Sequence, residues 1–146
     1  MATILILEDD EQVRVLAASF LEGEGHNALT ASTGDQALAV LKSEQKIDVL
    51  FTDLNVQQDP EAGLKLARKA AALRPGLKVV YTSGQGMTDG MAELFVDHAA
   101  FLPKPYTTEQ LGTMLLTKFG FGASAKPDGG GAVLERGWDK PGNLNR

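Results

Sequence analysis

Acidic, hydroxyl and basic side chains follow short apolar runs at four points along this chain. They are Glu8, Asp9 and Asp10 after the first run, Asp53 after a second, Ser83 after a third and Lys104 after a fourth. Like charges crowded at one point repel each other, so the acidic cluster requires a cation or a solvated loop. Carboxylates, a hydroxyl and an ammonium group together predict a site that binds a metal ion and a phosphate.

Short apolar runs and amphipathic stretches alternate along the chain, and together they predict the elements that must position these residues. The strand-like runs cover residues 4–7, 27–31, 47–52, 77–82 and 99–102, and helical periodicity covers 13–21, 37–41, 64–73, 91–96 and 111–119. Five such units predict an α/β fold with a parallel sheet and helices on both faces. Ligands of open parallel sheets bind at the carboxyl ends of the strands, where the polar residues lie.

The fourth helical stretch has a weak beginning. Gly84, Gly86 and Gly90 precede it, and glycine permits many backbone conformations. We therefore expect this helix to be mobile or partly unwound.

Length and composition narrow the class of protein. The 146 residues fit one domain, and the formal net charge of −5 argues against nonspecific binding to nucleic acid or an anionic membrane. The sequence contains no cysteine, so it has no disulfide and no thiolate site. Nothing at the start resembles a signal peptide, and no apolar run is long enough to span a membrane. We expect a cytoplasmic protein.

The periodic pattern stops after residue 121. Residues 122–146 are rich in Gly, Pro and Asn, which predicts a disordered tail, with docking through Trp138 as the alternative. The expected organisation is one domain over residues 1–121 followed by this tail.

The polar residues and their order resemble the receiver domain of two-component response regulators. The resemblance rests on Glu8-Asp9, Asp53, Ser83-Gly84, Phe101 and Lys104-Pro105, and it extends from Ala2 to about Phe119. It implies a flavodoxin-like (βα)5 fold with strand order 2-1-3-4-5. It also implies a signalling protein that is not an enzyme acting on a separate substrate.

The resemblance assigns a role to each acidic residue. Asp53 becomes the phosphoacceptor, and Glu8, Asp9, Asp53 and the backbone carbonyl of Asn55 become the Mg²⁺ ligands. Mg²⁺ prefers octahedral oxygen ligands and keeps several waters, which such a set satisfies. The register set by Arg14 leaves Asp10 outside the pair, and it could instead serve the helix dipole.

Three further residues complete the implied site. Lys104 would pair with Asp53 and later with the phosphoryl oxygen, and the Lys104–Pro105 bond is expected to be cis. The Ser83 hydroxyl would donate a hydrogen bond to the phosphoryl group, and Thr82 is the alternative residue for this role. Phe101 would be the switch aromatic, although an ordinary core Phe explains it equally well. His26 and His98 have no expected role.

One loop departs from the family pattern. The family usually carries Met-Pro shortly after the phosphoacceptor, whereas this chain reads Val56-Gln57-Gln58-Asp59-Pro60 and has a longer loop before Gly63. Because this loop flanks Asp53, the departure bears on partner choice and on the rate of dephosphorylation.

The resemblance favours a stand-alone phosphoacceptor switch. A sensor histidine kinase or a histidine phosphotransfer protein would phosphorylate Asp53, and the surface of the fourth helix, fifth strand and fifth helix would then engage a downstream protein. The alternatives are a phosphorelay intermediate, a phosphate sink and an interaction module independent of phosphate. A phosphatase of the haloacid dehalogenase type is disfavoured because the acidic pair precedes the nucleophile and Asn55 replaces that family's second acid.

Overall fold

Five parallel strands form one sheet in this computed structural model, which describes residues 1–85 and 90–121. The strand order is β2-β1-β3-β4-β5, which confirms the expected fold class. The strands are β1 (Thr3–Leu7), β2 (Asn27–Ala31), β3 (Val49–Asp53), β4 (Lys78–Ser83) and β5 (Ala100–Pro103). The expected tail, including Trp138, lies outside the described residues.

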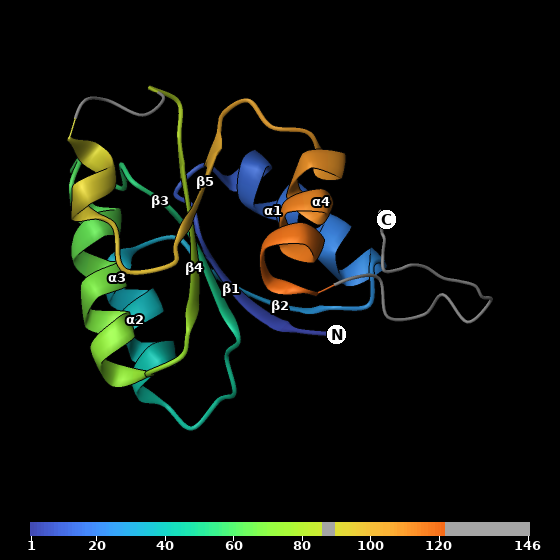
Figure 1. The fold of residues 1–146 in the computed structure, drawn as a ribbon, viewed down its shortest axis with the longest axis horizontal. Helices are drawn as coiled ribbons and strands as arrows, with labels where there is room; N and C mark the ends of the chain where they lie inside the picture. Colours follow the sequence, from blue (N-terminus) through green and yellow to red (C-terminus); the bar gives the residue numbers. More distant parts are fainter. Residues whose placement is uncertain (86–89, 122–146) are drawn as a thin grey trace.

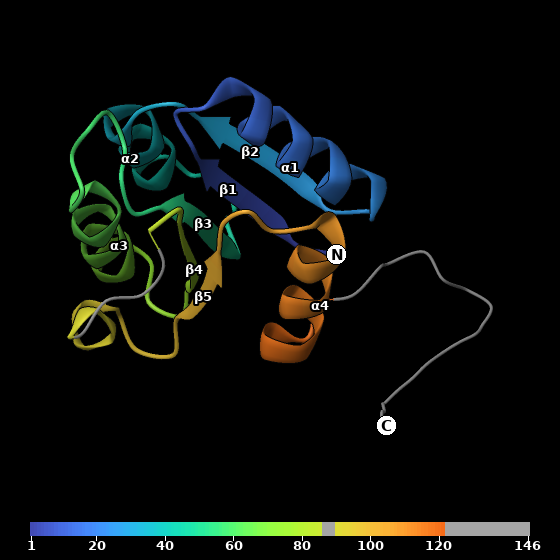
Figure 2. The ribbon, with the colours of Figure 1, turned by 90° about the horizontal axis from the view of Figure 1, so that it is seen from above.

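Helices cover both faces of the sheet (Figure 1). They are α1 (Glu11–Gly23), α2 (Gly34–Lys42), α3 (Ala62–Leu73) and α4 (Thr108–Phe119). Figure 2 shows α2 and α3 on one side of the strands and α1 and α4 on the other. Within residues 1–85 and 90–121, no helix combines the length and apolar character needed to cross a membrane.

Two apolar cores follow from this three-layer arrangement. One packs α2 and α3 against the sheet, and the other packs α1 and α4 against its opposite face. Strands β1 and β3 are buried at every residue, as expected for strands covered on both faces. The rigid sheet therefore fixes where the ends of β1 and β3 lie.

Polar side chains define the beginnings of the helices. Asp10 caps α1 by accepting hydrogen bonds from the backbone N–H groups of Gln12 and Val13. Thr33 caps the beginning of α2, and Thr107 caps the beginning of α4 in a capping box with Gln110. These side chains satisfy N–H groups that the first turn of a helix leaves unpaired.

The expected fourth helix is partly unwound, in keeping with the glycine-rich sequence that precedes it. In its place the described residues contain only a short 3-10 helix, η1 (Met91–Leu94), and Phe95 is extended with φ −73° and ψ 150°. The Phe95 ring stacks on Tyr81 at a centroid distance of 4.1 Å and lies 6.1 Å from Phe101. Aromatic packing against the sheet thus takes the place of a regular helical face.

Candidate phosphoacceptor and metal site

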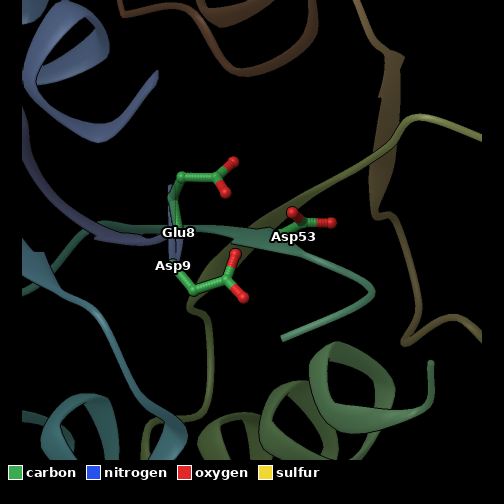
Figure 3. A group of neighbouring side chains, drawn as sticks. All are labelled: Glu8, Asp9 and Asp53. Carbon is green, nitrogen blue, oxygen red and sulfur yellow. The ribbon is translucent and has the colours of Figure 1, made fainter. Parts of the chain in front are cut away.

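Three carboxylates converge at the carboxyl ends of β1 and β3. Glu8 and Asp9 come directly after β1, and Asp53 is the last residue of β3 (Figure 3). One oxygen from each lies within 4.8 Å of the others. Glu8 and Asp53 are only 3% and 6% exposed, whereas Asp9 is exposed. The sheet therefore brings together residues that are 44 positions apart in the chain (53 − 9).

Lys104 supplies the positive charge of the cluster. Its Nζ lies 2.7 Å from Glu8 Oε1 and 2.8 Å from Asp53 Oδ2. The residue follows β5 directly, and the peptide bond to Pro105 is cis, as expected. A lysine between two largely buried carboxylates offsets the repulsion that these would otherwise impose on each other.

Burial and charge perturb the titration of this cluster. Burial raises the pKa of Glu8, against the opposing effect of its hydrogen bond from Lys104. Burial alone would lower the pKa of Lys104, but hydrogen bonds to Asp53 and Glu8 outweigh it and the pKa is raised. Lys104 therefore remains a cation at neutral pH and is able to neutralise an anion at this position.

Backbone contacts hold Glu8 and Asp53 in place. Arg14 Nη1 donates a hydrogen bond of 2.8 Å to the Glu8 carbonyl oxygen, which joins α1 to the end of β1. The Asn55 backbone N–H donates to Asp53 Oδ1 at 3.1 Å. Asn55, whose carbonyl is an expected metal ligand, thus directly adjoins the phosphoacceptor candidate.

The donor set fits Mg²⁺. Oxygens bound to one Mg²⁺ are at most about 4.2 Å apart, since each lies about 2.1 Å from the ion. A spacing of up to 4.8 Å therefore requires only a small side-chain adjustment or one ligand acting through water. Carboxylate oxygens are also the ligands that this hard cation prefers.

Ser83 is joined to Lys104 through the backbone, because the Lys104 N–H donates a hydrogen bond of 3.0 Å to the Ser83 carbonyl oxygen, whereas Phe101 lies on β5 beside Tyr81 of β4. Ser83 ends β4, is 5% exposed, and its Oγ accepts a hydrogen bond of 3.1 Å from the Gln85 N–H. Within the described chain no hydrogen bond joins Ser83 to Asp53. Phe101 is half-buried and stacks on Phe95. Neither histidine belongs to the metal cluster: His26 is buried at the start of β2 and His98 is exposed.

Thr82, the rival hydroxyl, lies beside the phosphoacceptor candidate in the sheet. Its Cα is the register partner of Asp53 on the neighbouring strand. Thr82 Oγ1 is a buried hydroxyl for which residues 1–85 and 90–121 provide no hydrogen-bond partner. Both hydroxyl candidates therefore remain near Asp53.

Two neighbours of the site were not predicted from the sequence. Tyr106 packs edge-to-face on Phe51 at 5.6 Å, and burial, together with the charge of Glu8, raises its pKa to about 12. The Gln57 backbone N–H donates a hydrogen bond of 2.9 Å to Asp9 Oδ2. Every residue except proline has a backbone N–H, so residue types could not predict the contact between Gln57 and Asp9. The only sequence signal for it was the unusual loop after Asp53.

The fold, with carboxylates and a lysine at the carboxyl ends of its parallel strands, is that of a signalling domain. The family model of the response regulator receiver domain matches residues 4–116. The chain therefore belongs to the response regulator receiver domain family of two-component signalling.

Individual relatives agree with this assignment. Sensor kinase CckA of Brucella abortus (strain 2308) is 30% identical over 115 residues, which are 77% of this chain and 12% of the kinase. The chain therefore spans only a small part of that relative. A response regulator receiver protein from Sinorhizobium medicae WSM419 is 30% identical, with a TM-score of 0.70 over 80% of this chain and 96% of that one.

A third similarity supports the fold alone. The receiver domain of sensor histidine kinase PA1611 from Pseudomonas aeruginosa PAO1 is 18% identical, with a TM-score of 0.67 over 79% of this chain and 94% of that chain. That domain was solved with a magnesium ion coordinated in its active site cleft.

Proposed function

We propose that Asp53 accepts a phosphoryl group from a phosphorylated histidine of a sensor kinase or a histidine phosphotransfer protein. A bond forms between an Asp53 carboxylate oxygen and phosphorus, the histidine N–P bond breaks, and the electron pair of that bond stays with the imidazole. The observation that carries the proposal is the largely buried Asp53 carboxylate 2.8 Å from Lys104 Nζ and beside Glu8 and Asp9.

The surrounding residues have separate tasks in this transfer. Lys104 stabilises negative charge on the phosphoryl oxygens, which is the main catalytic requirement of phosphoryl transfer. Glu8, Asp9, Asp53 and the Asn55 carbonyl would hold Mg²⁺, which when bound would neutralise further charge at this position. The PA1611 domain, which has the same fold, holds a magnesium ion in its cleft, and this is consistent with Mg²⁺ as the ion proposed here.

The response to phosphorylation is assigned to Ser83 and Phe101. The Ser83 oxygen accepts a hydrogen bond of 3.1 Å from the Gln85 N–H, which leaves its own O–H proton to donate to the phosphoryl group. Phe101 then changes its packing against Phe95, which alters the surface formed by η1, β5 and α4. A downstream protein recognises that surface, whether the chain serves as a switch, a relay intermediate or a sink.

Beryllofluoride, a mimic of the aspartyl phosphate, tests this function. With Mg²⁺ it should bind the wild-type protein and move the backbone amide resonances of Ser83 and Phe101 in NMR spectra. Asp53→Asn should abolish these changes. Asp10→Asn is the matched control, because Asn caps a helix as well as Asp does.

Two results would count against the function. Equal spectral changes in Asp53→Asn would contradict the assignment of the phosphoacceptor. No binding to the wild-type protein would favour an interaction module that does not use phosphate. Movement of Thr82 rather than Ser83 would transfer the hydroxyl role to the rival residue.

A further inference from the structure

The loop after the phosphoacceptor forms a tight turn over residues Val56 to Asp59. The two end residues exchange backbone hydrogen bonds, with Val56 N–H to Asp59 O at 3.2 Å and Asp59 N–H to Val56 O at 3.0 Å. The central residues, Gln57 and Gln58, have φ values of 54° and 68°. Positive φ at both central positions is typical of type I′ turns, which favour Asn and Gly rather than Gln.

This turn contacts the metal site through one backbone group. The Gln57 N–H donates a hydrogen bond of 2.9 Å to Asp9 Oδ2, across 48 positions of sequence. Asp9 is the exposed member of the three carboxylates, so burial does not fix its side chain as it fixes Glu8 and Asp53. The hydrogen bond therefore restricts the one carboxylate of the set that would otherwise be free to rotate.

Both ends of the turn are anchored, so its position is defined. Val56 is 2% exposed and belongs to the core between the sheet and α3. Asp59 Oδ1 accepts a hydrogen bond of 2.9 Å from the Glu61 N–H, and its Oδ2 lies 3.8 Å from Lys65 Nζ. Because the core holds one end and the start of α3 holds the other, the Gln57 N–H is presented to Asp9 in a fixed direction.

We propose that the turn over Val56 to Asp59 is a positioning element for the Mg²⁺ site, acting through the Gln57 backbone N–H on Asp9. A carboxylate has about four lone-pair sites, so one hydrogen bond leaves oxygen lone pairs free for a metal ion. Groups that orient a metal ligand in this way strengthen metal binding. This inference rests on the proposed function in one respect, namely that Glu8, Asp9 and Asp53 form the metal site. Gln57 is then a positioning residue, because it acts through Asp9.

Substitutions at position 57 separate the backbone group from the side chain. Gln57→Pro removes the N–H and also displaces the turn, because proline fixes φ at about −65° where Gln57 has 54°. Both changes take the donor away from Asp9 and should weaken Mg²⁺ binding about tenfold, as measured by isothermal titration calorimetry. Gln57→Gly keeps the N–H and readily adopts positive φ, so its dissociation constant should stay within about twofold of wild type. Equal weakening in Gln57→Gly would overturn the proposal, because the side chain would then be responsible.

A spectroscopic measurement tests the same hydrogen bond without a proline in the turn. In the metal-free protein, Asp9→Ala should shift the Gln57 amide proton upfield and accelerate its exchange with solvent, because it removes the acceptor. Asp10→Asn, the matched control, should leave that resonance unchanged. A Gln57 amide that does not respond to Asp9→Ala would overturn the proposal.

The calorimetric outcomes distinguish this inference from the proposed function. If the wild-type protein does not bind Mg²⁺, the metal assignment itself fails. If the wild type binds Mg²⁺ and Gln57→Pro binds it equally well or more tightly, the metal site stands and the positioning role of the turn is wrong.

Discussion

The three consecutive acids after β1 show how neighbouring residues of similar chemistry acquire different tasks. Glu8 is buried against Lys104, Asp9 faces the turn after β3, and Asp10 caps α1. The sequence was sufficient to set Asp10 aside, because the register with Arg14 identified the other two as the pair. It could not predict the contact of Asp9 with Gln57, since two glutamines are not the usual signal of a type I′ turn.

Lys104 is the cation that offsets the repulsion between the Glu8 and Asp53 carboxylates. Lys104→Met leaves the Glu8 and Asp53 carboxylates facing each other without their cation, which should lower the free energy of unfolding by about 2 kcal/mol in metal-free buffer. Saturating Mg²⁺ should restore part of the loss, because the ion replaces the missing positive charge. Urea denaturation with and without Mg²⁺ measures both effects.

An exposed lysine serves as the control for this substitution. The Lys46 side chain is 79% exposed and lies 3.8 Å from Asp48, so Lys46→Met should change stability by less than about 0.5 kcal/mol. If metal-free Lys104→Met were as stable as Lys46→Met, the charge balance described for the site would be wrong.

At the scale of elements, the start of α3 is packed directly against the end of β3. The Gly63 N–H donates a hydrogen bond of 2.9 Å to the Leu54 carbonyl oxygen. A Cβ atom at position 63 would collide with the backbone oxygen of Asp53 and lie 2.8 Å from the Leu54 Cα. Only glycine allows this approach, so Gly63 helps fix the backbone of the phosphoacceptor candidate.

Substitution of Gly63 gives a prediction with a natural control. Gly63→Ala should destabilise the protein by about 1–3 kcal/mol, because backbone atoms must move to admit the methyl group. Gly34→Ala in α2 meets no atom within 4 Å and should be neutral or stabilising by up to about 1 kcal/mol. Thermal unfolding of both variants measures the difference, and similar midpoints would contradict this account of the β3–α3 junction.

The periodicity of residues 91–96 overstated the fourth helix, although the glycines before it predicted that it would be partly unwound. Met91, Leu94, Phe95 and Val96 have helical spacing, yet only Met91–Leu94 forms η1 among the described residues. The physical reason lies in long-range packing: the Phe95 ring stacks on Tyr81, and the Tyr81 hydroxyl accepts a hydrogen bond of 3.2 Å from the Val96 N–H. A local periodicity contains no information about a partner on β4.

At the scale of the whole molecule, the alternating pattern alone predicted a parallel sheet with helices on both faces. The strand order 2-1-3-4-5 came from the family resemblance rather than from periodicity, and the structure has that order. The convergence of Asp9, Asp53 and Lys104 depends on this order, because β1, β3 and β5 are far apart in the chain. The ends of the predicted strands therefore gave the location of the site, whereas the geometry of the turn after β3 could not be predicted from the sequence.

A buried histidine makes global stability depend on pH. His26 is 7% exposed, and its Nδ1 accepts a hydrogen bond of 3.0 Å from the Ala2 N–H. Burial and the charge of the N-terminus lower its pKa, against the opposing effect of Glu24. The unfolded chain, with a His pKa of about 6.5, therefore takes up a proton before the folded state does.

The sign of the pH effect follows from this difference. The His26 contribution should be fully present above about pH 6.5 and should be lost as the pH falls from there towards the lower pKa of the folded state. His26→Asn should abolish this part of the pH dependence, whereas His98→Asn, at an exposed position, should retain it. Urea midpoints between about pH 5 and pH 8 test the prediction, and identical pH profiles for wild type and His26→Asn would contradict it.

Covalent modification of Asp53 is the most direct test of the central claim. Intact-mass spectrometry after incubation with a small phosphodonor such as phosphoramidate should show the addition of one phosphoryl group to the wild type and to Asp10→Asn. This addition should require Mg²⁺ and should be absent in Asp53→Asn. An equal mass gain in Asp53→Asn, or no gain in the wild type with Mg²⁺ present, would contradict the account.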